Sequence, residues 1–474
     1  MPVLGLSSGF GTRAFGEINR TNLFGGSWAA KLSMPSDIFN GTADYQSTAT
    51  DASGNYFTAH QIYTGSLNGI VLIKYSSDGA ILWSRKLTET GKSFYFSNLA
   101  VDSSGNPIIV INVYGSYYSG YIVKYNSSGT LQWQRSITNS SSAQGLSWNG
   151  GNNITIDSAD SVYVAFTNDS TTYLTTVKYN SSGTLQWQRQ ISGFSYIRVN
   201  GIAAESSGQN ILVAATINNS SGGTDLFVAK YDYSGTLGWQ KTIYTSTAVA
   251  ASRTMYGYSV ANNNNDSSGI TISGFTTPGA VTGTAPTAFL ININASGVIS
   301  WGSEFYSKIN PNNDNYGQAY GISISYYNSY AIVVGQDQGN YWFAGFTPTT
   351  GDNTWAIQNY MGLPGEPNFY SSSQVAGSKS DGNYIAAGLV YNNDTGDYTA
   401  MIYKLRINSN PESALVPYKF FNTKFTYKPF TLTNTTTHHF VAATSTYTTS
   451  TPTHTSATPT ATDAAGSVSL TLVP

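Results

Sequence analysis

The sequence predicts an all-β protein, a seven-bladed β-propeller of four-stranded antiparallel blades whose ring is closed by an N-terminal strand. Three observations predict this fold. A tryptophan recurs seven times at intervals of 50 to 62 residues, and a glycine stands four residues before most of these tryptophans. Short turns rich in Asp, Ser, Gly and Asn separate the apolar runs between them. Periods of this size are typical of stacked supersecondary units.

The repeat is clearest in thirteen residues, VKYNSSGTLQWQR, which occur unchanged at 123–135 and at 177–189. We expect the tryptophan of each copy to pack its blade against the next one, because a large aromatic ring buries much apolar area. The seven equivalent tryptophans are Trp28, Trp83, Trp133, Trp187, Trp239, Trp301 and Trp355. The preceding glycines are Gly79, Gly129, Gly183, Gly235, Gly297 and Gly351.

The third unit shows how one blade is built. Its last strand alternates, with Leu185, Trp187, Arg189 and Ile191 on one face and glutamines on the other. Alternation of period two between Gly/Asn/Ser turns is typical of antiparallel strands in a meander. The unit contains four such strands, which is the number in a propeller blade. We expect these strands at 153–158, 162–168, 173–180 and 184–191.

The two ends of the repeat region complete each other. Residues 25–33 carry only the pattern of a fourth strand, which includes Trp28. The unit near 370–408 carries the first three strands and has no tryptophan strand after Lys404. Together they make one seventh blade, and joining both chain ends in one sheet removes exposed strand edges.

The repeat divides the chain into three parts: an N-terminal arm at 1–23, the propeller at 24–408 and a C-terminal β/Thr-rich arm at 409–474. In the last part we expect an extended strand or small β-element at 410–434 and a short strand at 466–474. The Thr-rich composition between them predicts either a flexible tail or an arm that becomes ordered by packing on neighbouring subunits. The N-terminus lacks both a basic start and an apolar core, so we expect no secretory signal peptide.

Charge and composition exclude several classes of function. Only 10% of the residues are charged and the formal net charge is −2, so we expect no nucleic-acid partner. No apolar run approaches the roughly 18 residues of a membrane span, so we expect no membrane insertion. The chain has no cysteine, which excludes disulfides and thiolate chemistry.

Histidines and acidic turns offer little metal chemistry. His60 follows a strand, where we expect a structural role, and the other histidines lie in the low-complexity segment. These are His438, His439 and His454. The Asp-bearing turns, such as DASGN at 51–55 and DSSGN at 102–106, match ordinary hairpins better than a calcium cage. We expect no metal and no cofactor.

The arginines argue against an enzyme. Arg85, Arg135 and Arg189 share one repeat position, so they lie around the ring and cannot converge on its axis. We expect these three to be framework groups. The remaining arginines, Arg13, Arg20, Arg198, Arg253 and Arg406, are too few to suggest an arginine triad. We therefore predict no catalytic residues.

Binding residues are sought where the repeats differ, because loops on a rigid scaffold are common recognition sites. The segment 114–121 in blade 2 and the segment 336–343 in blade 6 are rich in aromatic residues. Tyrosine and tryptophan provide rigid contact area for sugars or proteins. The binding candidates are Tyr117, Tyr118, Tyr341 and Trp342.

The motif KYNSSGTLQWQR resembles the seven-bladed β-propeller repeats called SBBP, over residues 24–408. Such repeats occur in secreted bacterial proteins and in structural proteins of bacteriophages, including those of cyanobacteria. Units five to seven depart from the motif, since the KY pair is absent at 292–293 and 346–347.

The resemblance implies a non-enzymatic structural protein on the surface of a phage virion. It would be a tail fibre, baseplate or appendage component that acts in assembly and host attachment. Its partners would be other virion proteins and a host-surface glycan or protein, within a symmetric homo- or hetero-oligomer. Two alternatives stay open: a secreted carbohydrate-binding, lectin-like propeller, and a glycan-degrading propeller enzyme.

Overall fold

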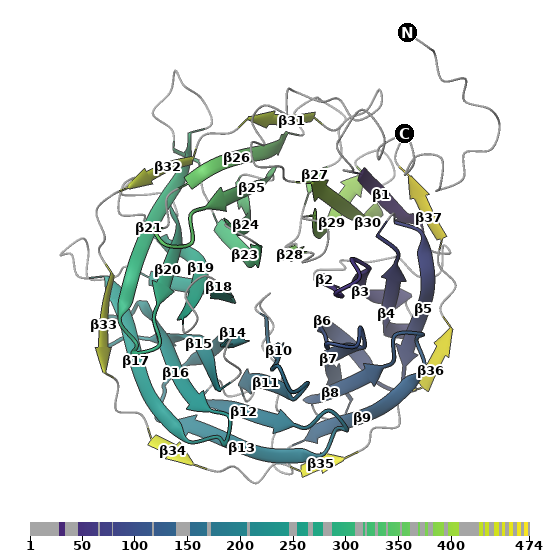
Figure 1. Ribbon diagram of the computed structural model, residues 1–474, viewed down its shortest axis with the longest axis horizontal. Helices are drawn as coiled ribbons and strands as arrows, with labels where there is room; N and C mark the ends of the chain where they lie inside the picture. The colour runs from purple at the N-terminus through teal and green to yellow at the C-terminus, as the bar shows by residue number, and fades with distance from the viewer. Residues whose placement is uncertain are drawn as a thin grey trace.

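Seven β-sheets surround a common centre in the computed structural model of the chain (Figure 1), counted over the residues that it describes. The described residues contain no helix, so the predicted all-β propeller is confirmed. The N-terminal arm at 1–23 lies outside them. The structure describes residues 28–33, 46–64, 67–77, 79–115, 118–138, 152–167, 172–205, 209–245, 254–263, 269–277, 287–308, 316–317, 320–327, 330–337, 340–350, 353–360, 368–369, 375–377, 383–392, 397–406 and seven short strands between 426 and 472.

Blades 1 to 4 follow the predicted repeat, each with four antiparallel strands in chain order from the centre of the ring outward (Figure 1). Blade 1 contains β2 (Gln46–Thr50), β3 (Tyr56–Thr64), β4 (Leu67–Tyr75) and β5 (Ile81–Thr88). Blade 2 contains β6 (Ser93–Val101), β7 (Pro107–Tyr114), β8 (Tyr118–Tyr125) and β9 (Leu131–Thr138). Blade 3 contains β10 (Ile154–Ile156), β11 (Val162–Thr167), β12 (Tyr173–Tyr179) and β13 (Leu185–Ser192). Blade 4 contains β14 (Ile197–Ala204), β15 (Asn210–Asn218), β16 (Thr224–Asp232) and β17 (Leu237–Thr245).

Blades 5 and 6 keep the same order although their sequences depart from the motif. In blade 5 a further short strand, β22 (Tyr316–Gly317), pairs with the end of the outer strand. Blade 5 contains β18 (Thr254–Asn263), β19 (Gly269–Thr277), β20 (Thr287–Ile293) and β21 (Ile299–Lys308). Blade 6 contains β23 (Tyr320–Tyr327), β24 (Tyr330–Asp337), β25 (Asn340–Phe346) and β26 (Asn353–Tyr360).

Blade 7 is assembled from both ends of the propeller region, as the sequence predicts. Strand β1 (Trp28–Ser33) pairs with β30 in an antiparallel register that places Trp28 opposite Lys404. The inner strands of this blade come from the C-terminal unit. They are β27 (Asn368–Phe369), β28 (Val375–Gly377), β29 (Asn383–Asn392) and β30 (Asp397–Arg406).

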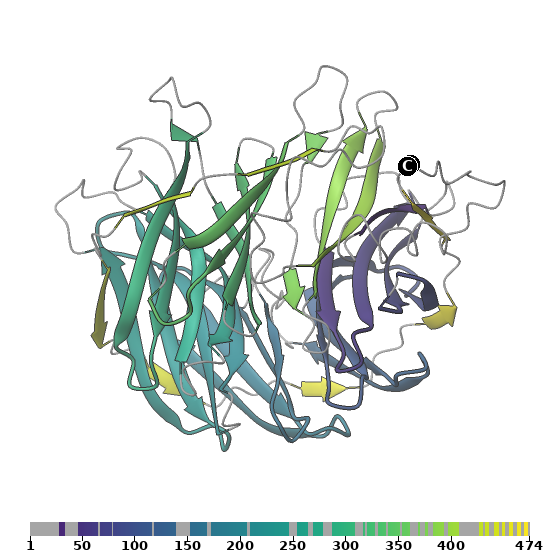
Figure 2. The same ribbon diagram turned by 45° about the horizontal axis from the view of Figure 1, so that its top comes forward.

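The threonine-rich C-terminal segment adds a fifth strand to every sheet. Its seven short strands lie on the outer rim of the ring (yellow in Figures 1 and 2), each antiparallel to the fourth strand of one blade. We call them the C-terminal strap. In order, β31 (Thr426–Pro429), β32 (Leu432–Thr435), β33 (Phe440–Thr444), β34 (Thr448–Ser450), β35 (Thr455–Ala457), β36 (Thr462–Ala465) and β37 (Ser469–Leu472) pair with blades 6, 5, 4, 3, 2, 1 and 7.

The strap differs from the flexible tail, or the arm ordered by neighbouring subunits, that composition predicts for 409–474. Two properties of the segment explain the difference. Threonine favours extended backbone, and the segment carries few charges that would oppose its pairing with the outer strands. The fourth strand of each blade otherwise presents a row of unpaired N–H and C=O groups, which the strap satisfies within the same chain.

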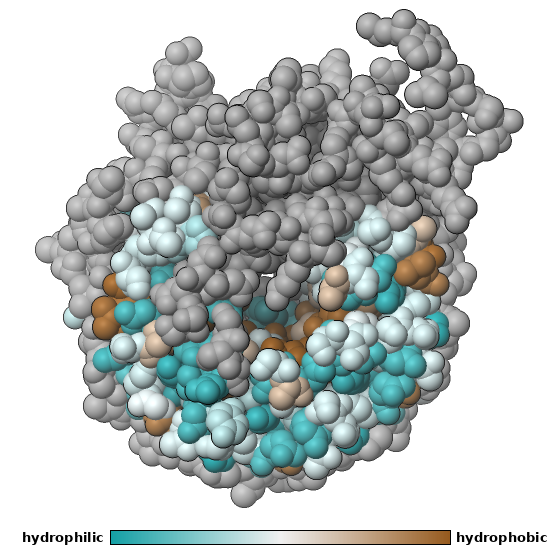
Figure 3. All heavy atoms as spheres, viewed as in Figure 1, coloured by the Kyte–Doolittle hydropathy of each residue, from teal (hydrophilic) through white to brown (hydrophobic). Residues whose placement is uncertain are grey.

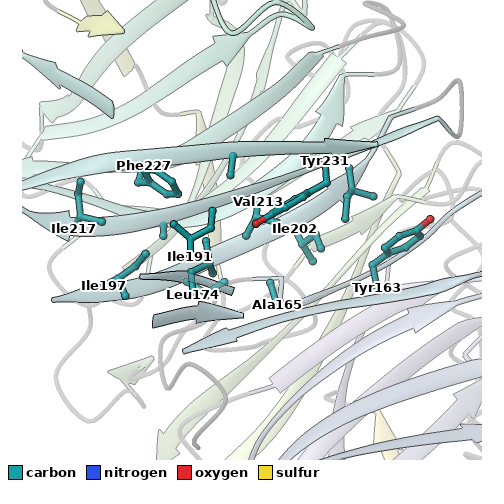
Figure 4. Packing of buried hydrophobic residues seen from close by; sticks show 14 of the residues in the cluster. Tyr163, Ala165, Leu174, Ile191, Ile197, Ile202, Val213, Ile217, Phe227 and Tyr231 are labelled. Carbon is teal, nitrogen blue, oxygen red and sulfur yellow. The ribbon is translucent and has the colours of Figure 1, made fainter. Parts of the chain in front are cut away.

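The core lies between adjacent blades, because the middle strands bury side chains on both faces. All seven residues of β20 and all six residues of β11 are buried. Figure 4 shows the cluster between blades 3 and 4, where Leu174 and Ile191 meet Val213 and Phe227. Polar side chains predominate on the coloured surface of Figure 3, with hydrophobic residues near the centre and at the rim.

Deleting residues 409–474 should expose the outer edge of every blade. We expect Tm to fall by roughly 10 °C or more, and the shortened chain to form concentration-dependent oligomers through its free edges. Scanning calorimetry and light scattering after size-exclusion chromatography measure both effects. Deletion of residues 1–23 is the control, since it keeps every described strand. A monomeric chain of unchanged Tm after removal of 409–474 would show that the strap stabilises nothing.

Candidate functional site

The two ends of the ring differ in what they carry. One end, which we call the turn face, holds the turns between the first and second strands and between the third and fourth strands of each blade. The other end, the hairpin face, holds the hairpins between the second and third strands and the connections between blades. The repeated residues of the sequence gather on the turn face, whereas the residues that differ between blades gather on the hairpin face.

On the turn face, a lysine joins each of blades 1 to 4 to the next blade. In blade 2, Lys124 Nζ lies 2.7 Å from Asp102 Oδ2 and donates a hydrogen bond of 3.2 Å to the carbonyl oxygen of Ser181, in blade 3. Burial raises the pKa of Asp102, but the hydrogen bonds from Lys124 and Asn106 outweigh it and hold that pKa below its ordinary value.

The tryptophan and the arginine of blade 2 reach the same turn of blade 3. Trp133 Nε1 donates to the carbonyl of Ser181 at 3.0 Å, and Arg135 Nε donates to the carbonyl of Gly183 at 2.6 Å. The Arg135 guanidinium also lies over the Trp133 ring, at 5.7 Å from its centroid. Three side chains of one blade therefore hold a single turn of its neighbour, an arrangement that we call the inter-blade joint.

The joint is repeated around the described part of the ring. The lysine and the tryptophan donate to one carbonyl of the next blade in four joints. These donors and acceptors are Lys74 and Trp83 to Ser127, Lys124 and Trp133 to Ser181, Lys178 and Trp187 to Tyr233, and Lys230 and Trp239 to Ala295. At the fifth, Trp301 donates to Pro348 at 2.8 Å, while Asn292 replaces the lysine and bonds within its own blade.

These contacts explain the glycine that precedes most of the tryptophans by four residues. Gly183 has a φ of 77°, a conformation that favours glycine. A Cβ atom on Gly183 would lie 2.7 Å from Cδ2 of Trp133, in the preceding blade. The glycine is therefore required twice, by the turn and by the ring that packs on it. The tryptophans expected to pack on the next blade do so at 83, 133, 187, 239 and 301; for Trp28 and Trp355 the structure describes the backbone only.

The carboxylate oxygens of the acidic turns accept hydrogen bonds from other groups of the protein, as Asp102 shows. Asp102 Oδ1 accepts from the backbone N–H groups of Ser104 and Asn106, and Oδ2 accepts from the Asn106 side chain and pairs with Lys124. Within the described residues, no three His, Cys, Asp or Glu side chains lie close enough together to hold a metal ion. The described part likewise contains no helix of the length and hydropathy that a membrane span needs.

The histidine that the structure describes, His60, lies away from the surface. His60 is fully buried in β3, where its Nε2 atom lies 2.7 Å from Thr58 Oγ1, and burial lowers its pKa to about 3. The equivalent position in blade 2 is Ile111, which faces the preceding blade. The other histidines, His438, His439 and His454, lie outside the described residues.

The binding candidates lie on the hairpin face but on different blades. Tyr118 starts β8 opposite Tyr114, while Tyr341 and Trp342 lie in β25 opposite Gln336 and Gly335. Only the backbone of these candidates is described, and Tyr117 lies outside the described residues. Since blades 2 and 6 are not neighbours in the ring, the structure does not bring the two pairs into one cluster.

Exposed tyrosines lie at both faces of the ring. Tyr233, in the turn between β16 and β17, is 58% exposed on the turn face, and three others lie at the hairpin face of consecutive blades. Tyr114, Tyr173 and Tyr244 end or begin strands at this face of blades 2, 3 and 4, and they are 43%, 38% and 37% exposed. Tyrosine combines a rigid apolar ring with a polar tip, so such residues suit contacts with sugars and with protein surfaces. The hairpin face is therefore the candidate recognition surface.

Sequence reasoning set Arg198 aside, but the structure gives it a distinct environment. Arg198 lies in β14, the innermost strand of blade 4, and its guanidinium lies 5.4 Å from the centroid of the Tyr258 ring in blade 5. The signal that could have identified it is its position, because it lies outside the repeat position of Arg85, Arg135 and Arg189.

No protein-family model and no curated protein matches the chain. Similar solved structures include the WD40 domain of coronin from Toxoplasma gondii, at 10% identity over 81% of this chain and 87% of that chain, with a TM-score of 0.46. Polysaccharide lyase Uly1 is 10% identical over 76% of this chain and 90% of that chain, with a TM-score of 0.43. A subtype N10 neuraminidase-like protein of A/little yellow-shouldered bat is 8% identical over 79% and 98%, with a TM-score of 0.38. None of these likenesses assigns an activity.

A pair of glycine substitutions isolates the packing at one inter-blade joint. Gly183→Ala and Gly222→Ala introduce the same strain, since the two φ angles are 77° and 82°, but a Cβ on Gly222 meets nothing within 4 Å. We expect Gly222→Ala to lower the free energy of unfolding by about 1–2 kcal/mol, and Gly183→Ala by about 1–3 kcal/mol more. Urea unfolding measures both. Equal losses in the two variants would mean that Trp133 does not constrain Gly183.

Proposed function

We propose that the chain is a non-enzymatic structural protein of a bacteriophage particle, a fibre, baseplate or appendage component of the tail. The observation that carries this proposal is that the recurring side chains of the repeat bond to neighbouring blades. The recurring lysines, tryptophans and arginines, which would be the natural candidates for a ligand site, instead hold the turns of neighbouring blades. With the strap on its rim, the ring suits a part that must keep its shape on a particle.

The resemblance of the KYNSSGTLQWQR motif to SBBP repeats supports the same proposal. In it, the protein lies at the particle surface and contacts other virion proteins, within a symmetric homo- or hetero-oligomer. The hairpin face, with Tyr114, Tyr173 and Tyr244, meets a glycan or a protein of the host surface. Attachment to the host is then a property of side chains that the repeat leaves free to vary.

A secreted, lectin-like carbohydrate-binding propeller is the second candidate function. The exposed tyrosines of the hairpin face favour it, because aromatic rings provide flat apolar surfaces for sugar rings. The two functions share the same surface and differ in where the protein is found. A glycan-degrading propeller would also use this face, and turnover of a capsular polysaccharide by the purified chain would identify it.

The proposal predicts that the protein is part of the assembled particle. In a density gradient of a phage lysate, peptides of this chain should follow the particle band at a fixed ratio to other particle proteins. Mass spectrometry of the gradient fractions measures this. Recovery from the soluble fraction alone would contradict the proposal, and binding of the isolated soluble chain on a glycan array would then favour the lectin-like alternative.

A further inference from the structure

One arginine of the hairpin face has an unused pair of donors. Arg198 lies at the hairpin-face end of β14, opposite Thr216 of β15. Among the described residues, no acceptor lies within hydrogen-bond distance of its Nε and Nη2 atoms, although both atoms are shielded from solvent. An unpaired donor of a charged group is costly and needs an explanation.

The two unpaired nitrogens lie on the same edge of the guanidinium. This edge presents two parallel N–H donors whose spacing matches the two oxygens of a carboxylate or sulfate group. The repeated arginines differ in this respect. Arg135 and Arg189 donate from Nε to a glycine carbonyl and from Nη1 to a carbonyl of their own strand.

Arg198, in the innermost strand of blade 4, lies beside aromatic rings from the first two strands of blade 5. The guanidinium lies over the Tyr258 ring, and the rings of Tyr256 and Tyr258 both stack on Phe275, at 5.0 Å and 5.5 Å between centroids. Arg198, Tyr256 and Tyr258 are each partly exposed. A bulge in the pairing of β18 with β19, between Gly257 and Ser259, lies at Tyr258. The same irregularity occurs in the inner strands of blades 2, 4 and 6, so it belongs to the repeat and is not specific to this site.

A buried polar network holds this arrangement in place. Asn200 Nδ2 donates to the carbonyl of Gly257 at 2.6 Å, and the N–H of Gly257 donates to Thr216 Oγ1 at 3.1 Å. Asn200 and Thr216 are completely buried and bond to each other. The backbone next to Tyr258 is thus fixed to β14 and β15, the strands that also place Arg198. The backbone of the site is therefore fixed before binding, so that only a side chain has to move when the ligand arrives.

We propose that Arg198 anchors a binding site for an acidic saccharide, a sugar that carries a carboxylate or a sulfate group. The oxyanion bonds to Nε and Nη2. One face of the Tyr258 ring stacks on Phe275 and the other lies under the Arg198 guanidinium, so the sugar meets the partly exposed edges of Tyr256 and Tyr258. Because both nitrogens are shielded, the ligand reaches them by displacing a neighbouring side chain. The inference rests on the proposed function only in that a host-surface glycan is the source of such a ligand.

The test measures binding of simple probes to the full chain by nuclear magnetic resonance. The probes are glucuronic acid, glucose 6-sulfate, glucose and inorganic phosphate. We expect one of the two acidic sugars, or both, to bind, with glucose and inorganic phosphate weaker by about tenfold or more. Arg198→Lys keeps the charge but loses the two-pronged edge, so the affinity for the acidic sugar should fall by about tenfold or more.

Arg85→Lys is the matched control, since it changes an arginine of the inter-blade joint in blade 1 and should leave the affinity unchanged. Arg198→Met adds a readout that a structural role would not give. It removes two unpaired donors, so Tm should stay equal or rise while acidic-sugar binding is lost. The proposal is overturned if neither acidic sugar binds, if inorganic phosphate binds equally well, or if Arg198→Lys binds as the unchanged chain does. Location on a phage particle is measured separately, so either proposal can fail alone.

Discussion

The ring depends on one interaction, in which a blade donates hydrogen bonds to the carbonyl groups of the next blade's outer turn. A tight turn presents carbonyls that its own strands cannot satisfy, and in this chain Trp133 Nε1 and Lys124 Nζ share the carbonyl of Ser181. Side chains of one repeat are therefore satisfied by backbone of another. The contacts that stabilise the ring therefore lie between two repeats and not within one.

The outer edges impose the second constraint. A propeller blade ends in a strand that has a partner on one side only, and unpaired edges invite association between molecules. Strand β1 solves this problem at one place, by joining the two ends of the propeller region opposite β30. The strap then covers the outer edge of every blade, passing around the ring in reverse order from blade 6 to blade 1 and ending on β1. Closure and edge protection thus both use segments outside the six unbroken repeats.

Much of the fold could be predicted from the sequence because repetition supplies the information that a single segment lacks. The alternation of Leu185, Trp187 and Arg189 fixes a strand, and its recurrence fixes the number of blades. Trp28 could be paired with the segment ending at Lys404 because the N-terminal segment has only a fourth strand, and the C-terminal unit has only the first three. The strap could not be predicted in this way. Its three- to five-residue strands carry no repeat motif, so nothing in residues 426–472 indicates which blade each one pairs with.

The candidate site was harder to predict for a related reason. Tyr118, Tyr341 and Trp342 stand out by composition, but tyrosine is common throughout the chain, and the structure places them on separate blades. Arg198 has no sequence motif. Its environment arises from β14, β18 and β19, which meet only in the folded ring.

The most direct test of the account is hydrogen exchange across one inter-blade joint. Trp187→Phe keeps an aromatic ring but removes the Nε1 donor to the carbonyl of Tyr233 in blade 4. The account predicts faster exchange at the turn 232–236 of blade 4, whose amides Gly235 and Thr236 bond to Asp232, with blades 1 and 2 unchanged. Faster exchange confined to blade 3, with the turn of blade 4 protected as before, would contradict it.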